Sequence, residues 1–219
     1  MTRSILLCSL ALVGLTSLAC TSATGLLRPS QGGDEHTAIL VETFADGQEG
    51  WWTDLRNGGD CEVMDGKLRI SVPDQKGTSV TGHPQLDYLS PPYVLEVVIR
   101  HTGGSGADYL AIGFRFSDNE NVSTLHVNGN GQVALGVMQA GEYLELIPWT
   151  RSYQSLEGST RLQLVDQGDR ISVSLGDEAV LSIPFEYLKP GGVYFFVGAY
   201  DAVGSTWEVD DVSAWDPPG

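Results

Sequence analysis

The residues best suited to ligand binding in this chain are aromatic and charged side chains that alternate with apolar ones. From 110 to 116 the even-numbered residues are apolar, so a strand here would bury them and point Tyr109 and Arg115 the other way. Tryptophan and tyrosine rings stack on sugar rings, whereas carboxylates and guanidinium groups bind sugar hydroxyls. The same alternation in neighbouring segments predicts a ligand-binding set: Glu96, Arg100, Tyr109, Arg115, His126, Tyr143, Glu145 and Trp149.

Two small residues, Ala111 and Gly113, lie among these larger side chains and would leave room for a shallow groove. The sequence is also consistent with a second interpretation. Sheets commonly carry scattered aromatic residues on a solvated outer face that binds nothing. The pattern therefore defines a candidate surface and leaves both interpretations open.

Residue patterns typical of hydrolases with a nucleophilic serine or a metal are missing. The sequence contains no Gly-x-Ser-x-Gly segment of the kind that presents a nucleophilic serine. Its histidines, His36, His83, His101 and His126, are scattered without a local metal-binding spacing. No catalytic residues are predicted.

The elements that position these residues are short strands. Period-two alternation recurs along the chain, and turn sequences such as Asp65-Gly66 and Gly176-Asp177 separate the alternating segments. About a dozen short strands at this spacing require a closed or two-layered antiparallel architecture. The sequence therefore predicts an all-β fold.

The order of short motifs resembles the concanavalin A-like lectin/glucanase superfamily, specifically the laminin-G-like jelly rolls of exported bacterial proteins. The resemblance spans about residues 40 to 215, and the last motif is similar to a Phe-Asp-Asn-Val closing strand from which Val209 and Asp211 depart. The motifs are Phe44 with Gly50-Trp51-Trp52, then segments 64–70, 95–100, 112–116, 146–150, 192–198 and 208–212.

The resemblance implies a two-sheet antiparallel jelly-roll sandwich whose ligands lie on the concave sheet or its rim. This superfamily holds both glucanases and non-catalytic binding modules, so fold alone does not give function. Its retaining glucanases carry two glutamates on one strand, about 5 Å apart. Glu208-Val209-Asp210 begins like that pattern, but no second glutamate follows. A related bacterial group hydrolyses 3-keto-glycosides, which keeps a hydrolase as the alternative.

The resemblance also implies a structural Ca²⁺ between the first and last strands. The oxygen-rich side chains available there are Glu42, Asp46, Asp210 and Asp211. In the other interpretation Asp210 and Asp211 mark a β-bulge. An extra residue would let both Val209 and Val212 face inward despite their opposite parity.

Composition limits the partners of the chain. The 219 residues carry a net charge of -16, which disfavours nucleic acid and anionic lipid headgroups. The cysteines are Cys8, Cys20 and Cys61, too few for a disulfide scaffold. We expect Cys61 to be buried as a small apolar residue.

The N-terminus is typical of an export signal. Arg3 precedes an apolar run from Ile5 to Leu18, which is shorter than the ~20 residues that span a bilayer. The Leu-Ala-Cys ending resembles the lipobox of bacterial lipoproteins, in which Cys20 would be lipidated, although Ser17 stands where that family prefers leucine. Cleavage after Ala19 or Ala23 by ordinary signal peptidase is the alternative.

The predicted organisation is a signal peptide (1–19), a disordered tether (20–38), the sandwich (39–215) and a tail (216–219). We expect an exported, monomeric lipoprotein, facing the periplasm or cell exterior, that contacts the membrane through its anchor alone. Its domain would bind carbohydrate or a cell-surface glycan without catalysis. The alternatives are a glycoside hydrolase acting on 3-keto-glycosides or glucan, and a structural or adhesive surface domain.

Overall fold

The computed structural model describes residues 37–47, 50–151, 156, 158–199 and 204–217. These residues form fifteen strands and one short 3₁₀ helix, η1 (Pro84–Leu86). None of the described residues belongs to a helix with the length and apolar character needed to cross a membrane. Cys20 and the rest of the predicted signal and tether up to residue 36 lie outside the described residues.

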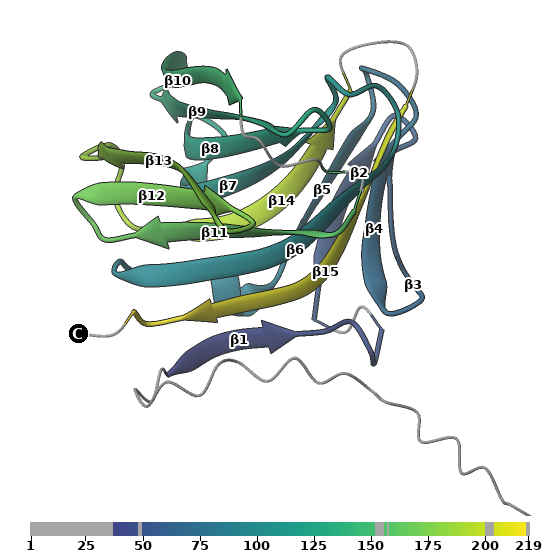
Figure 1. The fold of residues 1–219 in the computed structure, drawn as a ribbon, viewed down its shortest axis with the longest axis horizontal. Coiled ribbons are helices and arrows are strands. Elements are labelled where there is room, and N and C mark those ends of the chain that lie inside the picture. Colours follow the sequence, from purple (N-terminus) through teal and green to yellow (C-terminus); the bar gives the residue numbers. More distant parts are fainter. Residues whose placement is uncertain (1–36, 48–49, 152–155, 157, 200–203, 218–219) are drawn as a thin grey trace, which may run out of the picture. The chain divides into compact units, whose positions relative to one another are not determined.

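The strands form two antiparallel sheets, drawn in Figure 1. Sheet A is formed, in spatial order, by β13 (Glu178–Pro184), β12 (Arg170–Leu175), β11 (Thr160–Asp166), β6 (Tyr93–Gly103), β15 (Ser205–Trp215), β4 (Lys67–Val72) and β3 (Asp60–Met64), with β1 (Ala38–Glu42) paired to β15. Sheet B is formed by β10 (Glu142–Arg151), β9 (Gln132–Gln139), β8 (Asn121–Asn128), β7 (Tyr109–Asp118), β14 (Gly192–Gly198), β5 (Thr78–Gly82) and β2 (Trp52–Arg56).

Late strands lie between early ones in both sheets. In sheet A the last strand, β15, pairs with β6 on one side and with β4 and β1 on the other, and Figure 1 shows β1 running beside it. In sheet B, β14 pairs with both β7 and β5. This interleaving makes one unit of residues from both ends of the domain, and it confirms the predicted two-sheet jelly-roll sandwich.

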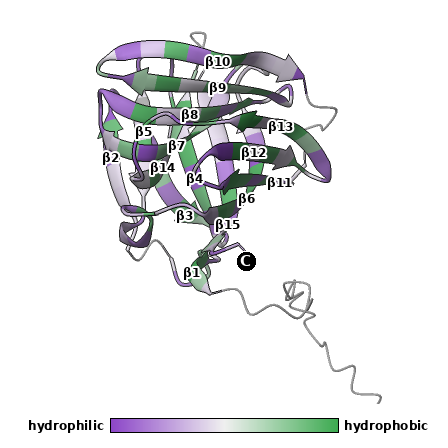
Figure 2. Cartoon of the chain, turned by 90° about the vertical axis from the view of Figure 1, so that its left-hand side faces the viewer, coloured by the Kyte–Doolittle hydropathy of each residue, from purple (hydrophilic) through white to green (hydrophobic). Residues whose placement is uncertain are grey.

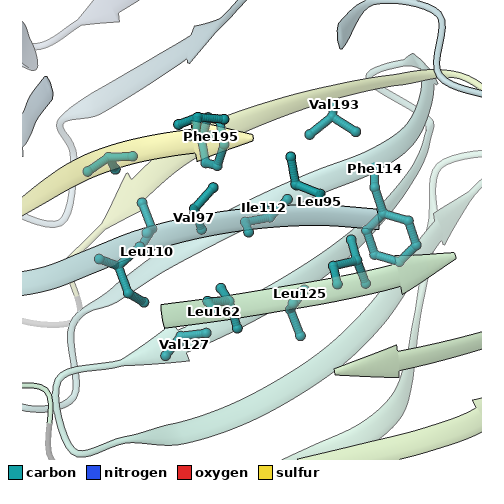
Figure 3. Close-up of a cluster of buried hydrophobic side chains, with 14 of the residues drawn as sticks. Leu95, Val97, Leu110, Ile112, Phe114, Leu125, Val127, Leu162, Val193 and Phe195 are labelled. Atoms are coloured by element: carbon teal, nitrogen blue, oxygen red, sulfur yellow. The ribbon is translucent and has the colours of Figure 1, made fainter. Parts of the chain in front are cut away.

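The core lies between the sheets and is built from the alternation seen in the sequence. Figure 2 shows hydrophobic and hydrophilic segments alternating along single strands. Leu95 and Val97 on β6 are fully buried, as are Leu110, Ile112 and Phe114 on β7, and Figure 3 shows these side chains together with those of β8, β11 and β14. Each such strand therefore presents its other face to the outside of the sandwich.

Two local expectations are also met. Asp65 and Gly66 both have positive φ angles, 53° and 71°, and connect β3 to β4, as expected for a tight hairpin turn. In β15 the register shifts between Asp210 and Val212, so Asp211 is the extra residue of a bulge. Val209 and Val212 are both fully buried as a result, which confirms the bulge interpretation.

Candidate functional site

The outer face of sheet B carries a continuous group of aromatic side chains, which we call the aromatic face. They come from β2, β7, β8, β10 and β14, five of the seven strands of the sheet. Its members are Trp52, Tyr109, Phe116, His126, Tyr143, Trp149, Tyr194 and Phe196. The most exposed are Tyr143, at 54%, and Trp52, at 38%.

Rings of the aromatic face lie flat on glycines of neighbouring strands. Tyr194 pairs with Gly113 across β14 and β7, and three atoms of its ring lie within 2.7 Å of the position that a Gly113 Cβ would take. Such nearly equal distances arise when the face of the ring, and not its edge, covers the glycine. An aromatic side chain can cover a cross-strand glycine in this way because no side chain stands between them.

The same arrangement recurs at three more glycines. The ring and hydroxyl of Tyr109 lie where a side chain of Gly198 would be, and the hydroxyl end of Tyr143 lies where a side chain of Gly136 would be. Trp52 Cζ2 lies 2.7 Å from the equivalent position at Gly82. Each of these aromatic side chains thus rests on the backbone of a glycine. Tyr194, Tyr109 and Trp52 each pair across the sheet with the glycine that they cover. Tyr143 pairs with Met138 and reaches Gly136 from a diagonal position.

His126 lies at the centre of a ring cluster on this face. Its ring centroid is 4.9 Å from that of Tyr109, 6.0 Å from that of Phe196 and 6.1 Å from that of Trp149. Burial lowers the pKa of His126 to about 4, so the imidazole is neutral at neutral pH. Burial also raises the pKa of Tyr194 to about 12. The cluster is therefore uncharged and largely apolar.

Carboxylates flank the aromatic face at its two ends. Glu145 on β10 pairs with Gly136, and Asp54 on β2 forms an exposed ion pair with Arg56 at 2.6 Å. Strands β10 and β2 are the opposite edges of sheet B. These two acids are consequently too far apart to act as the paired carboxylates of a glycosidase, which lie within about 10 Å.

The structure brings five of the predicted ligand-binding residues to this face. Tyr109, His126, Tyr143, Glu145 and Trp149 all lie on the outer side of sheet B, and Trp149 is half-buried against His126 instead of lying between the sheets. Their shared parity in the sequence thus corresponds to a shared surface.

The predicted outward orientation of Arg115 is wrong. Arg115 has a φ of 50° and lies in an irregular stretch of β7, where the register with β8 shifts between Phe114 and Asp118. Its side chain is 4% exposed and pairs with Asp166 of sheet A. The irregularity also reverses the expected inward direction of Phe116, which packs edge-on against Tyr194 at 4.9 Å on the aromatic face.

The predicted grouping of Glu96 and Arg100 with the other ligand-binding residues is also wrong. Both side chains project from β6 on the outer face of sheet A, on the other side of the sandwich. There Glu96 pairs with Arg161 at 3.1 Å, and Arg100 pairs with Glu208 at 3.7 Å. Alternation separates outside from inside but does not tell which sheet a strand joins.

The four acids proposed as calcium ligands do not gather into a metal site. Glu42 accepts hydrogen bonds from the Phe44 amide at 2.6 Å and from Trp51 Nε1 at 3.4 Å, and Asp210 pairs with Lys67 at 3.3 Å. Asp46 is exposed in the turn after β1, and Asp211 is the bulge residue. Within the described ranges, no group of three or more His, Cys, Asp or Glu side chains could hold a metal ion.

Four residues of the aromatic face were not predicted as ligand-binding residues: Trp52, Phe116, Tyr194 and Phe196. Trp52 lies on the edge strand β2, where its ring is partly exposed on Gly82. Tyr194 and Phe196 could have been found, because Val193, Phe195 and Val197 are the buried partners of the same alternation.

Comparison with known proteins gives the fold. No protein-family model matches the sequence, and no curated protein matches it. Among solved structures, the carbohydrate-binding module CBM66 of Bacillus subtilis is similar, with a TM-score of 0.60 and 18% identity over 76% of this chain and 96% of that one.

Two further structures are similar at 11% identity. The exoplasmic/lumenal domain of VIP36, in a form bound to Ca²⁺ and Man3GlcNAc, has a TM-score of 0.62 over 84% of this chain and 91% of its own. The β-glucanase of Bacillus licheniformis has a TM-score of 0.61 over 84% of this chain and 100% of its own. With its two interleaved antiparallel sheets, the chain has the concanavalin A-like jelly-roll fold.

Proposed function

We propose that the chain is a non-catalytic carbohydrate-binding module that holds its ligand on the aromatic face. The observation that carries this proposal is the set of rings lying flat on glycines across sheet B. A ring with one face on the backbone can offer its other face to a sugar, because the apolar face of a sugar stacks on a flat aromatic plate. Tyr143 and Trp52 are the most exposed of these plates.

The structural neighbours support the same class of ligand. One is named as a carbohydrate-binding module, another is a domain bound to a mannose-containing glycan, and a third is a glucanase. The separation of Glu145 from Asp54 favours binding over hydrolysis on this face, since a glycosidase needs two carboxylates flanking the bond that it cleaves.

The charge of the chain favours a neutral glycan. The net charge is -16, and the aromatic face is flanked by Glu145 and by the Asp54–Arg56 pair. An anionic polysaccharide would be repelled at low ionic strength. We therefore expect glucans, mannans or xylans to bind better than alginate.

The N-terminal sequence supports a location at a membrane. We propose that Cys20 is lipidated after export, so that the domain binds glycan as a monomer at a membrane surface. Residues 21–37 would then serve as the tether between anchor and domain.

Affinity electrophoresis of the purified chain against glucan, mannan, xylan and alginate, with assay for released sugars, tests the proposal. At least one neutral polysaccharide should retard the protein without product release, and Trp149→Ala should weaken binding by about 1–3 kcal/mol, as for an anchoring aromatic residue. Trp215→Ala is the matched control, because Trp215 lies in sheet A. Release of sugars would support the hydrolase alternative, and equal retardation of Trp149→Ala and wild type would contradict binding at this face.

A further inference from the structure

Two buried polar atoms at the aromatic face have no hydrogen-bond partner among the described residues. The hydroxyl Oγ1 of Thr124 and the ring nitrogen Nε2 of His126 are both buried, and neither meets a partner among the described residues. Thr124 itself is only 8% exposed. Buried polar groups in folded proteins nearly always have hydrogen-bond partners, so two such atoms without partners on one surface need an explanation.

Both atoms belong to one small area at the centre of sheet B. Thr124 and His126 are two residues apart on β8, so their side chains project to the same side. Thr124 lies between two glycines in its row, Gly113 on β7 and Gly136 on β9. His126 lies between Ala111 and Ala134 in the next row. The floor here is thus made of backbone, methyl groups and two unpaired polar atoms.

Rings from both sides cover this floor. Tyr194 covers Gly113 from the β14 side, and Tyr143 covers Gly136 from the β10 side. Tyr143 is the more exposed of the two and lies on the edge strand β10, whose register with β9 shifts twice, whereas Tyr194 lies on β14, which is paired on both sides with β7 and β5. The cover over Thr124 is therefore more easily displaced on the Tyr143 side.

We propose that Thr124 and His126 form the polar floor of a subsite for one pyranose ring, which enters when Tyr143 moves off Gly136. This inference rests on the proposed function. The sugar lies on the backbone of Gly136, one of its hydroxyls bonds to Thr124 Oγ1 and another to His126 Nε2, and Tyr143 stacks on its outer face. The hydroxyl of threonine can donate and accept, and the neutral imidazole nitrogen does either according to its tautomer. The floor thus selects hydroxyl-bearing neutral rings.

The matched pair of variants Thr124→Val and Ser123→Ala tests this subsite. Valine keeps the shape of threonine and has a methyl group in place of the hydroxyl. Ser123 is the adjacent residue, with a buried hydroxyl that is likewise unpaired within the described residues but faces the core. Thr124→Val should weaken binding of the neutral polysaccharide retained by wild type by about two- to tenfold, the effect of one lost neutral hydrogen bond. Ser123→Ala should not weaken it.

Two further measurements complete the test. His126→Phe keeps a ring among Tyr109, Phe196 and Trp149 and should also lower affinity, and the imidazole ¹⁵N signals of His126 should shift when an oligosaccharide of the same polysaccharide is added. Unchanged affinity in Thr124→Val and His126→Phe, with Trp149→Ala still impaired, would overturn the subsite and leave the proposed function standing. If wild type binds none of the polysaccharides, both fall.

Discussion

Arg115 and Asp166 are joined by two parallel hydrogen bonds across the interior of the sandwich. Arg115 Nε donates to Asp166 Oδ2 at 2.8 Å, and Nη2 donates to Oδ1 at 2.6 Å. The remaining guanidinium donors reach the carbonyl oxygens of Tyr187, Leu188 and Gly168 at 2.7–3.2 Å. The pair ties β7 of sheet B to the end of β11 in sheet A.

This relationship shapes the aromatic face as well as the interior. Because the irregular stretch of β7 turns Arg115 inward, Phe116 comes to the outer side and supports Tyr194. A buried bidentate ion pair gives a defined geometry, because Arg presents a rigid planar fork to the carboxylate.

Arg115→Met should lower the free energy of unfolding by about 3–5 kcal/mol, because it leaves the carboxylate of Asp166 buried without its cation. Urea denaturation measures the loss. The double variant Arg115→Met/Asp166→Leu should recover much of it, since neither charge is then buried. A loss under about 1 kcal/mol for the single variant would show that the pair does not stabilise the contact between the two sheets.

Gly113→Ala should destabilise the domain by about 1–3 kcal/mol, because the added methyl group occupies the space of the Tyr194 ring. Thermal unfolding measures the change, and polysaccharide affinity should fall with it as the ring is displaced. Gly158→Ala is the control, because no atom of the described residues lies within 4 Å of a Cβ there. Equal stability of the two variants would contradict the packing of Tyr194 on Gly113.

His126 should make the domain sensitive to acid. Its pKa is lowered from 6.5 to about 4 in the folded state, so the unfolded chain takes up the proton first. The free energy of unfolding is therefore highest, as far as His126 is concerned, above about pH 6.5. It falls by roughly 3 kcal/mol as the pH drops from there towards 4.

The difference in unfolding free energy between wild type and His126→Phe, measured from pH 7.5 to 4, isolates this effect from the titration of carboxylates. Wild type should lose stability relative to the variant as pH falls through this window. A difference that stays constant with pH would show that His126 is not held neutral by burial.

Cys20→Ala should abolish membrane association, because acyl chains contribute ~0.8 kcal/mol per buried CH₂ and two or three of them anchor a protein stably. Fractionation of cells and mass spectrometry of the mature N-terminus measure this. A mature N-terminus at Thr24, or a wild-type protein found in the soluble fraction, would contradict the proposal that the protein is a lipoprotein.

Period-two alternation by itself determined the all-β architecture and the inner and outer sides of most strands. It also placed Tyr109, His126, Tyr143 and Trp149 on an outer side, because strand parity is a local property of adjacent residues. Asp65-Gly66 likewise specified its hairpin turn locally, through the positive φ angles that this dipeptide tolerates.

Only the tertiary structure decided whether the outward side chains of a strand lie on the outer face of sheet A or on that of sheet B. The alternation in their strands points both Glu96 and Tyr109 outward. They still lie on different faces of the sandwich, because β6 joins sheet A and β7 joins sheet B, and sheet membership depends on pairing between distant segments. Arg115 departs from its local parity because Asp166, 51 residues away, and the carbonyl groups around it satisfy a buried guanidinium. The flat rings on glycines also required the register between strands, which no local pattern contains.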